Sequence, residues 1–164
     1  MQTEIDISEL VKYLRGHFRL NWRGHHGAAH WARVMLNGKT LAKAENGRQD
    51  VVTLFALLHD HERENEFIDP SHGQRAADNA VNLRNRFFKI DDAGFLLLYD
   101  AMALHSQGTL VADVTVQCCW DADRLDLGRV GIIPDPRYLC TATAKQPDYI
   151  RECYARSVNE NIKA

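Results

Sequence analysis

The sequence predicts an all-α protein, a compact bundle of about six to seven helices. Apolar residues recur at helical spacing along nearly the whole chain, which is the main sign of amphipathic helices. No convincing run alternates apolar and polar residues between hairpin turns, so strands are not expected. A length of 164 residues with 45% hydrophobic content suits one domain around one core. We expect that single domain to fill residues 1–164, with its core over about residues 24–140.

Three helices are expected in the N-terminal part of the chain. The first begins near Asp6 or Ser8, either of which can cap it, and carries an apolar stripe that ends at Phe18. The second is expected over about residues 26–44. The third, over about residues 49–60, is apolar nearly all round, as is typical of a helix at the centre of a core.

The C-terminal part supplies the remaining helices. One is expected through residues 76–83, another over residues 92–105, and a third over about residues 110–127, ahead of two glycines. The segment 132–139 contains two prolines and is predicted to be a stiffened loop. The last helix is expected over about residues 147–162. Its start is placed at Pro147, because proline suits the first turn of a helix.

Charge and composition favour a small, diffusible partner. The formal net charge is −2, which does not favour binding to nucleic acid or to an anionic membrane. No apolar stretch approaches the roughly 20 residues of a membrane span, and the acidic start MQTEIDISEL does not resemble a secretory signal. We therefore expect a cytoplasmic protein, and the sequence leaves open whether it forms a homodimer. The four cysteines lack zinc or redox spacing and are expected to be buried, reduced thiols.

The most informative motif is LLHD, where the apolar third helix ends on His59 and Asp60. An imidazole and a carboxylate at the end of a buried helix are costly to desolvate unless something satisfies them. A divalent cation would do so, and the partial negative charge of a helix C-terminus favours it. One such pair can equally cap a helix, but further candidate ligands occur elsewhere: His30, His72, His105 and Asp123. Together these imidazoles and carboxylates suit Mn, Fe, Ni or Zn, or Mg at a carboxylate-rich position.

The order and spacing of these residues resemble the HD-domain metal-dependent phosphohydrolase superfamily. The motifs that carry the resemblance are HxxxHxxRV around His30, LLHD at His59 and Asp60, and DADRLD around Asp123. They are most similar to its small stand-alone members and cover about residues 24–140. The resemblance implies a fold of five to seven helices and one divalent ion per chain, held by His30, His59, Asp60 and Asp123.

Dinuclear relatives add histidines at positions like His72 and His105. This sequence departs from the common HDxGK form, because HDHER replaces the glycine and the lysine. A second ion and the usual substrate contacts are therefore not carried over from the resemblance.

Two aspartates compete for the last ligand position. Asp121 and Asp123 lie about 200° apart on an ideal helix, so both can hardly reach one ion. Helical periodicity places Asp121 nearer the apolar stripe, whereas the DADRLD motif favours Asp123. We take Asp123 as the ligand and keep Asp121 as the alternative.

Five further residues are candidates for catalysis. Arg63 and Arg124 could bind phosphate oxygens, because a guanidinium matches them in two places, although surface ion pairs are the ordinary explanation for an arginine. His72, His105 or Glu62 could protonate a leaving alkoxide. Each of the three also has a plainer explanation. His72 would then be a surface residue near a helix start, His105 would complement the terminal carbonyls of its helix, and Glu62 would lie in a solvated charged loop.

The remaining histidines receive lesser roles. His25 and His26 precede the first ligand in a glycine-rich turn, and one of them is expected to order that turn or bind water. His17 and His61 are expected to face solvent.

These residues predict a hydrolase that cleaves a phosphate ester, a nucleotide or another small phosphorylated metabolite, by attack of metal-bound hydroxide. Two alternatives stay open: a non-catalytic protein that binds metal or nucleotide on the same scaffold, and an oxygenase with a dinuclear iron centre. Two irons per chain would favour the oxygenase, whereas a single redox-silent ion would favour hydrolysis.

Overall fold

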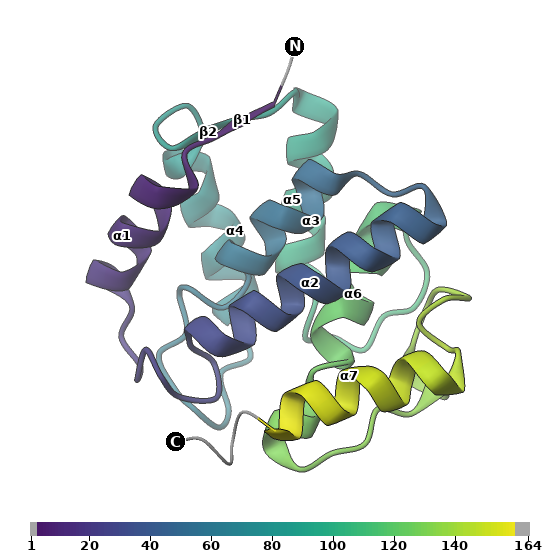
Figure 1. Cartoon of the computed structure of the whole chain (residues 1–164). Helices are drawn as coiled ribbons and strands as arrows, with labels where there is room; N and C mark the ends of the chain where they lie inside the picture. The colour runs from purple at the N-terminus through teal and green to yellow at the C-terminus, as the bar shows by residue number, and fades with distance from the viewer. Residues whose placement is uncertain (1–2, 160–164) are drawn as a thin grey trace.

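The computed structural model describes residues 3–159. Within this range the chain forms seven α-helices that pack around one core (Figure 1), so the all-α prediction is confirmed. The helices are α1 (Ile7–His17), α2 (Ala28–Glu45), α3 (Gln49–Leu58), α4 (His72–Leu83), α5 (Asp92–Leu104), α6 (Val114–Arg124) and α7 (Pro147–Asn159). Two short 3-10 helices come after α6, η1 (Leu127–Val130) and η2 (Pro136–Tyr138).

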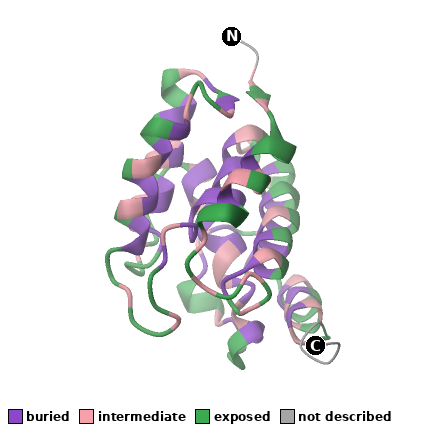
Figure 2. Ribbon diagram, turned by 90° about the vertical axis from the view of Figure 1, so that its left-hand side faces the viewer, coloured by how far each residue is buried: buried purple, intermediate pink, exposed green. Residues whose placement is uncertain are grey.

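The core is organised around α3. Every residue from Val51 to Leu58 is buried, as expected for a helix that is apolar on all sides. Helices α2, α5 and α6 pack against α3, α4 packs mainly on α5, and α7 lies beside α2 and η1. Figure 2 shows the consequence: buried residues face the interior of the bundle and exposed residues cover its outside.

A short antiparallel pair of strands differs from the sequence-based expectation. Strand β1 (Glu4–Ile5) pairs with β2 (Phe88–Lys89), with Glu4 opposite Lys89. Two residues per strand are too few to produce the alternating pattern that reveals a strand in a sequence. The pair joins the N-terminal segment to the chain just before α5, at the top of the molecule in Figure 1.

Several predicted helix limits also differ. Helix α4 begins at His72, before the expected residues 76–83, and α6 ends at Arg124 instead of about residue 127. Helix α3 ends at Leu58, so His59 is its C-cap residue and Asp60 lies beyond it. Helix α6 begins at Val114 instead of residue 110, because the Asp113 side chain accepts a hydrogen bond from the Thr115 N–H and starts the helix there. Helix α7 begins at Pro147 as predicted, and residues 160–162 of its predicted range lie outside the described residues.

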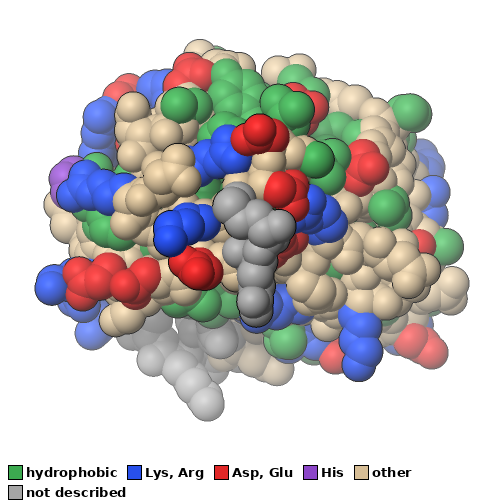
Figure 3. Space-filling model, turned by 90° about the horizontal axis from the view of Figure 1, so that it is seen from above, with side chains coloured by type: hydrophobic (Ala, Val, Ile, Leu, Met, Phe, Trp, Pro, Cys, Tyr) green, Lys and Arg blue, Asp and Glu red, His purple; other side chains and the backbone are tan. Residues whose placement is uncertain are grey.

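Three of the four thiols are buried as expected, and the surface carries charges of both signs. Lys and Arg side chains are interspersed with Asp and Glu on the face shown in Figure 3. Cys118, Cys119 and Cys153 are buried and Cys140 is half-buried, and all four are free thiols. Among residues 3–159, none of the helices is both long enough and apolar enough to cross a bilayer.

Candidate metal centre

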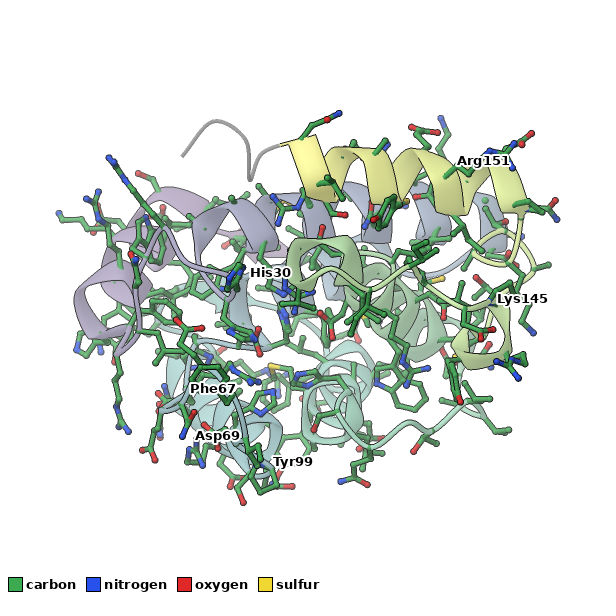
Figure 4. All side chains as sticks on the ribbon, turned by 90° about the horizontal axis from the view of Figure 1, so that it is seen from below. His30, Phe67, Asp69, Tyr99, Lys145 and Arg151 are labelled. Carbon is green, nitrogen blue, oxygen red and sulfur yellow. The ribbon has the colours of Figure 1, made fainter. Side chains whose placement is uncertain are left out.

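The candidate ligands meet because the ends of five helices converge at one place. His30 lies in the first turn of α2, His59 and Asp60 come directly after α3, and Asp123 is in the last turn of α6. The other two candidates, His72 and His105, are the first residue of α4 and the residue that caps the end of α5. All six except Asp123 are buried. Figure 4 shows His30 in the interior among other side-chain nitrogens.

Four of these side chains form the first cluster, which we call site A: His30, His59, Asp60 and Asp123. The Nε2 atoms of His30 and His59 are 3.0 Å apart. One oxygen of Asp60, Oδ2, lies 3.5 Å from each of these nitrogens. Asp123 Oδ1 lies 3.3 Å from His30 Nε2 and 3.8 Å from His59 Nε2. Two imidazoles and two carboxylates from three helices therefore surround one point.

The second cluster, site B, consists of Asp60, His72 and His105. The Nε2 atoms of the two histidines are 2.8 Å apart. The other oxygen of Asp60, Oδ1, lies 3.2 Å from His72 Nε2 and 3.7 Å from His105 Nε2. Asp60 thus presents one oxygen to each site and links them. Both triads, His30 with His59 and Asp60, and Asp60 with His72 and His105, have ligand atoms close enough to hold an ion.

The orientation of the imidazoles supplies a test of whether a metal ion fits. The Nδ1 atom of each of the four histidines lies against a fixed oxygen, so that Nδ1 carries the proton and Nε2 keeps its lone pair. Those acceptors are Asp126 Oδ2 for His30, at 2.7 Å, and the backbone carbonyls of Phe55, Asp69 and Met102 for His59, His72 and His105. Two imidazole nitrogens that face each other at 3.0 Å or 2.8 Å need either a proton shared between them or a cation that both can bind. The donor set therefore fits a divalent transition ion, with its histidines oriented as in known metal sites.

Electrostatics in site A also suit a cation. Burial lowers the pKa of His59 to about 3, so its imidazole is neutral. Burial and the charge of Arg129 oppose protonation of His30, but Asp123, Asp126 and Asp60 outweigh them and raise its pKa to about 9. Despite its burial, the pKa of Asp60 is held well below its usual value by the surrounding histidines. The site concentrates negative charge and favours a positive partner.

The two competing aspartates have different surroundings. Asp121 accepts hydrogen bonds from the backbone N–H groups of Cys140 and Thr141 and from the Thr141 hydroxyl. These contacts fix the loop before α7 and use both carboxylate oxygens. The structure brings Asp123, and not Asp121, to His30 and His59.

Of the two arginines singled out in the sequence, Arg63 lies next to the candidate ligands, whereas Arg124 binds backbone carbonyls elsewhere. Arg63 Nη1 is 3.0 Å from His72 Nε2 and 3.7 Å from Asp60 Oδ1. The Arg124 guanidinium instead donates to the carbonyls of Thr109 and Tyr138 and lies over the Trp120 ring. Arg124 therefore holds the loops that come after α5 and α6, and the expectation that it contacts phosphate is withdrawn.

Glu62 and His61 also differ from expectation. Glu62 Oε1 accepts from the Asn79 amide, and Oε2 lies 3.8 Å from an Arg19 nitrogen, so this carboxylate serves the surface between α1 and α4. His61, expected to face solvent, is only 4% exposed. Its Nδ1 lies against the Leu58 carbonyl and its Nε2 accepts from Asn79. The chain turns sharply after Asp60, and this turn points His61 inward against α4.

Two residues of the centre are not among the candidates singled out from the sequence, although one of them, Asp126, is the last residue of the DADRLD motif. Asp126 is 1% exposed and binds both His30 Nδ1 and the Arg33 guanidinium. Arg129 Nη2 lies 3.9 Å from Asp123 Oδ1, and its other nitrogens donate to the carbonyls of His25 and Asp126. Asp126 stands three residues after Asp123, a spacing that could have drawn attention to it.

A cavity of about 420 Å³ opens onto both sites. Its lining includes Asp60, His72, His105 and Asp123, with Arg63 and Arg129. His26 also lines it, and its Nδ1 lies 2.7 Å from Glu66 Oε2, while His25 is exposed and contributes its carbonyl to Arg129. Apolar side chains complete the wall, among them Phe67, labelled in Figure 4, Ile68 and Val130. The cavity gives a small molecule access to the candidate ligands.

Comparison with solved structures gives the fold an independent reference. The chain is similar to the crystal structure of a predicted HD superfamily hydrolase from an uncultured Thermotogales bacterium. The TM-score is 0.71 at 23% sequence identity, over 97% of this chain and 91% of the other. The two proteins share a fold. No family model and no curated protein matches the sequence.

Proposed function

We propose that this chain is a divalent-metal-dependent hydrolase of phosphate esters and a member of the HD-domain superfamily. The observation that carries the proposal is the convergence of His30 and His59, whose Nε2 atoms are 3.0 Å apart, on Asp60 and Asp123. The shared fold with a predicted HD superfamily hydrolase supports it. The substrate class, the metal and the reaction are all part of the proposal.

Site A is the proposed metal site, with His30, His59, Asp60 and Asp123 as ligands. Mn, Fe, Ni, Mg and Zn all accept imidazole and carboxylate ligands to differing degrees. When bound there, a divalent ion supplies Lewis acidity and a water of lowered pKa, the two contributions that phosphate ester hydrolysis needs most. The chain's own part is to fix the ligands: Asp126 orients His30, and the Phe55 carbonyl orients His59.

Arg63 and Arg129 are proposed to bind the phosphoryl group. Both guanidinium groups line the cavity, Arg63 next to Asp60 and Arg129 next to Asp123. A phosphoryl group in the cavity would therefore meet a positive charge on two sides. Guanidinium groups match phosphate oxygens in geometry and stay charged at any physiological pH.

His72 and His105 are proposed to hold the proton for the leaving group. Their Nε2 atoms, 2.8 Å apart, can share one proton at the floor of the cavity. Burial opposes this proton, but Asp60 and Asp123 raise the pKa of His105 above its usual value. A departing alkoxide could take that proton directly, which is ordinary general acid catalysis.

The shape of the cavity supports a small organic substrate. Phe67, 89% exposed, and Ile68, 82% exposed, line the cavity together with the exposed Val130. Exposed apolar side chains around a polar floor suit a phosphate ester whose other half is partly apolar. A nucleotide or another small phosphorylated metabolite meets this description, whereas the net charge of −2 does not favour nucleic acid.

The test is a panel of phosphate esters assayed with the chelated protein after addition of Mn²⁺, Mg²⁺, Ni²⁺ or Fe²⁺. The panel includes an aryl phosphate and several nucleoside monophosphates. We expect turnover that depends on the added ion and falls at least about a thousandfold in His59→Ala and in Asp60→Ala. His17→Ala is the matched control, because His17 is exposed and lies on α1.

Each alternative predicts a different result in this test. Metal binding without turnover on any ester would point to a non-catalytic binder. Two irons per chain together with oxygen consumption would point to an oxygenase, which the proximity of sites A and B through Asp60 would allow. Either result would contradict hydrolysis as the function.

A further inference from the structure

We propose that the Arg63 guanidinium takes the place of a second metal ion at site B, so that the centre holds a single divalent ion at site A. The inference rests on the proposed function, because it assumes that site A binds metal. Site B contains the ligands that a second ion would use, Asp60, His72 and His105. What distinguishes it from site A is an arginine, Arg63, that lies against two of these ligands, Asp60 and His72.

Arg63 lies directly beside the His72 imidazole. Its Nη1 is 3.0 Å from His72 Nε2 and 3.2 Å from Nδ1, nearly the same distance from both ring nitrogens. The Nε2 atom itself faces His105 Nε2, 2.8 Å away, where an ion at site B would bind. Such an ion would therefore have to displace Arg63 or bind next to its charge.

An ion at site B would also meet a fixed positive charge. Arg63 Nη1 lies 3.7 Å from Asp60 Oδ1, the oxygen that Asp60 presents to site B. The guanidinium cannot lose its proton inside a protein, so its charge is permanent. A dication placed among Asp60, His72 and His105 would stand within a few ångströms of that charge, and the repulsion would be strong at such a distance in a buried site.

Arg63 is in turn bound to its place by the same two partners. The residue is only 8% exposed, so its charge has little water to stabilise it. A buried charge needs nearby partners, and Asp60 and His72 are the partners within reach at this site. If an ion took both of them, Arg63 would lose its compensation. The exchange is therefore unfavourable for the arginine as well as for the ion.

Site A also has an arginine beside it, but other groups hold that arginine in place. Arg129 Nη2 lies 3.9 Å from Asp123 Oδ1. The carbonyls of His25 and Asp126 hold its guanidinium in that position. An ion at site A can bind His30 and His59 without moving Arg129. One centre with two sets of ligands thus accepts one ion.

Arg63 also takes over a chemical role of the ion that it replaces. In a two-ion centre the second ion helps to neutralise the phosphoryl oxygens. Arg63 would supply that positive charge here as a hydrogen-bond donor, next to the histidines that hold the leaving-group proton. The HDHER sequence, with arginine three residues after Asp60, encodes this arrangement.

The experiment measures how many Mn²⁺ ions the full chain binds, by calorimetric titration and by metal analysis after desalting. We expect one tight ion per chain for the natural sequence. Arg63→Met removes the charge and keeps much of the side-chain bulk, and we expect it to bind two ions, with the second dissociation constant at least about tenfold tighter than in the natural protein. Arg63→Lys keeps a positive charge and should stay at one tight ion.

Two controls locate the second ion. Arg129→Met is the matched arginine variant on the other wall of the cavity and should remain at one ion. Arg63→Met combined with His105→Ala should return to one ion, because it removes a ligand of site B. Electron paramagnetic resonance gives a second readout: two Mn²⁺ ions bridged by Asp60 should show a spin-coupled signal in Arg63→Met, and the natural protein an uncoupled one.

The outcomes separate this inference from the proposed function. Two equally tight ions in the natural protein, or one ion in a folded Arg63→Met variant, would overturn the role of Arg63 and leave a metal-dependent enzyme intact. No Mn²⁺ binding in any variant would overturn both. If Arg63→Met does not fold, Arg63→Gln is measured against the same expectations.

Discussion

Asp126 acts on the candidate centre through His30 and not through an ion. It is buried, lies 2.7 Å from His30 Nδ1 and also accepts from the Arg33 side chain. A carboxylate in this position fixes the tautomer of a ligating histidine and makes its other nitrogen a better donor to a metal. The residue thus sets the geometry of site A from outside it.

Replacing Asp126 with asparagine should therefore weaken metal binding without removing a ligand. We expect the dissociation constant of Mn²⁺ to rise about 10- to 100-fold in Asp126→Asn, because His30 loses its charged partner. Calorimetric titration measures the change, and circular dichroism checks the fold. Asp135→Asn is the control, since Asp135 pairs with the exposed Arg137 and not with His30. Equal affinity in Asp126→Asn and the natural protein would disprove the role.

At the scale of residues, motifs predicted side chains within or next to a helix better than those in the turns beyond it. The candidate ligands of site A come from the motifs HxxxHxxRV, LLHD and DADRLD, and the structure brings those side chains together. Asp126 and Arg129 escaped prediction because the chain leaves α6 after Arg124 and enters η1. Helical periodicity gives no direction for a side chain beyond the end of its helix, and the expectation for His61 was wrong for the same reason.

Helices α4 and α5 pack closely, and the missing side chain of Gly73 is what allows them to come so near to each other. A Cβ atom on Gly73 would lie 2.4 Å from the Met102 carbonyl oxygen and 3.1 Å from the His105 ring. Gly73 comes directly after His72, so the close approach of the two helices is also what places His72 beside His105. The absence of a side chain at position 73 is thus part of the geometry of site B.

Gly73→Ala should push the two helices apart. We expect a loss of about 1–3 kcal/mol in the free energy of unfolding, the usual cost of overpacking a tight contact. Urea denaturation followed by circular dichroism measures it. Gly16→Ala is the matched control in α1, where an added Cβ meets nothing within 4 Å. There alanine should stabilise by about 0.5–1 kcal/mol, because it favours a helix over glycine. Equal unfolding free energies for the two variants would contradict the tight contact.

Element by element, the sequence predicted the helices and not their limits. The stripes of α1 and α3 and the proline that opens α7 are local features, and local features are what periodicity and capping rules report. The start of α6 depends on Asp113, one of several residues that could have capped it. The pairing of β1 with β2 depends on a partner far along the chain, and strands of two residues are too short for the sequence pattern to predict that pairing.

At the scale of the molecule, sequence patterns cannot tell which helix ends meet. Six candidate ligands on separate segments are visible in the sequence, but their convergence results from the packing of α2, α5 and α6 around α3 and of α4 on α5. The same packing brings the N-terminal segment to the start of α3 and α5. There Arg48 pairs with Asp50 and with Asp91, and the Thr3 hydroxyl donates to Asp50.

This ion-pair cluster should make stability depend on pH in the acid range. Burial alone would raise the pKa of Asp50, but Arg48 and Thr3 outweigh it and hold the pKa below its usual value. A carboxylate whose pKa is lowered by folding contributes stability that is fully present above the pKa of the unfolded chain, about 3.9, and is lost as the pH falls through the folded value. Asp50→Asn should therefore lower the melting temperature at pH 7, and the difference from the natural protein should narrow as the pH falls below about 3.9.

Thermal melts of the two proteins near neutral pH and at a pH of about 3, below the unfolded pKa, measure this difference. Asp100→Asn, an exposed position on α5, is the control and should melt like the natural protein at both values. A difference between Asp50→Asn and the natural protein that stays constant over this range would mean that the Asp50 charge does not join the N-terminal segment to α3. In that case the hydrogen bond from Thr3 and the pairing of β1 with β2 would have to hold the segment in place.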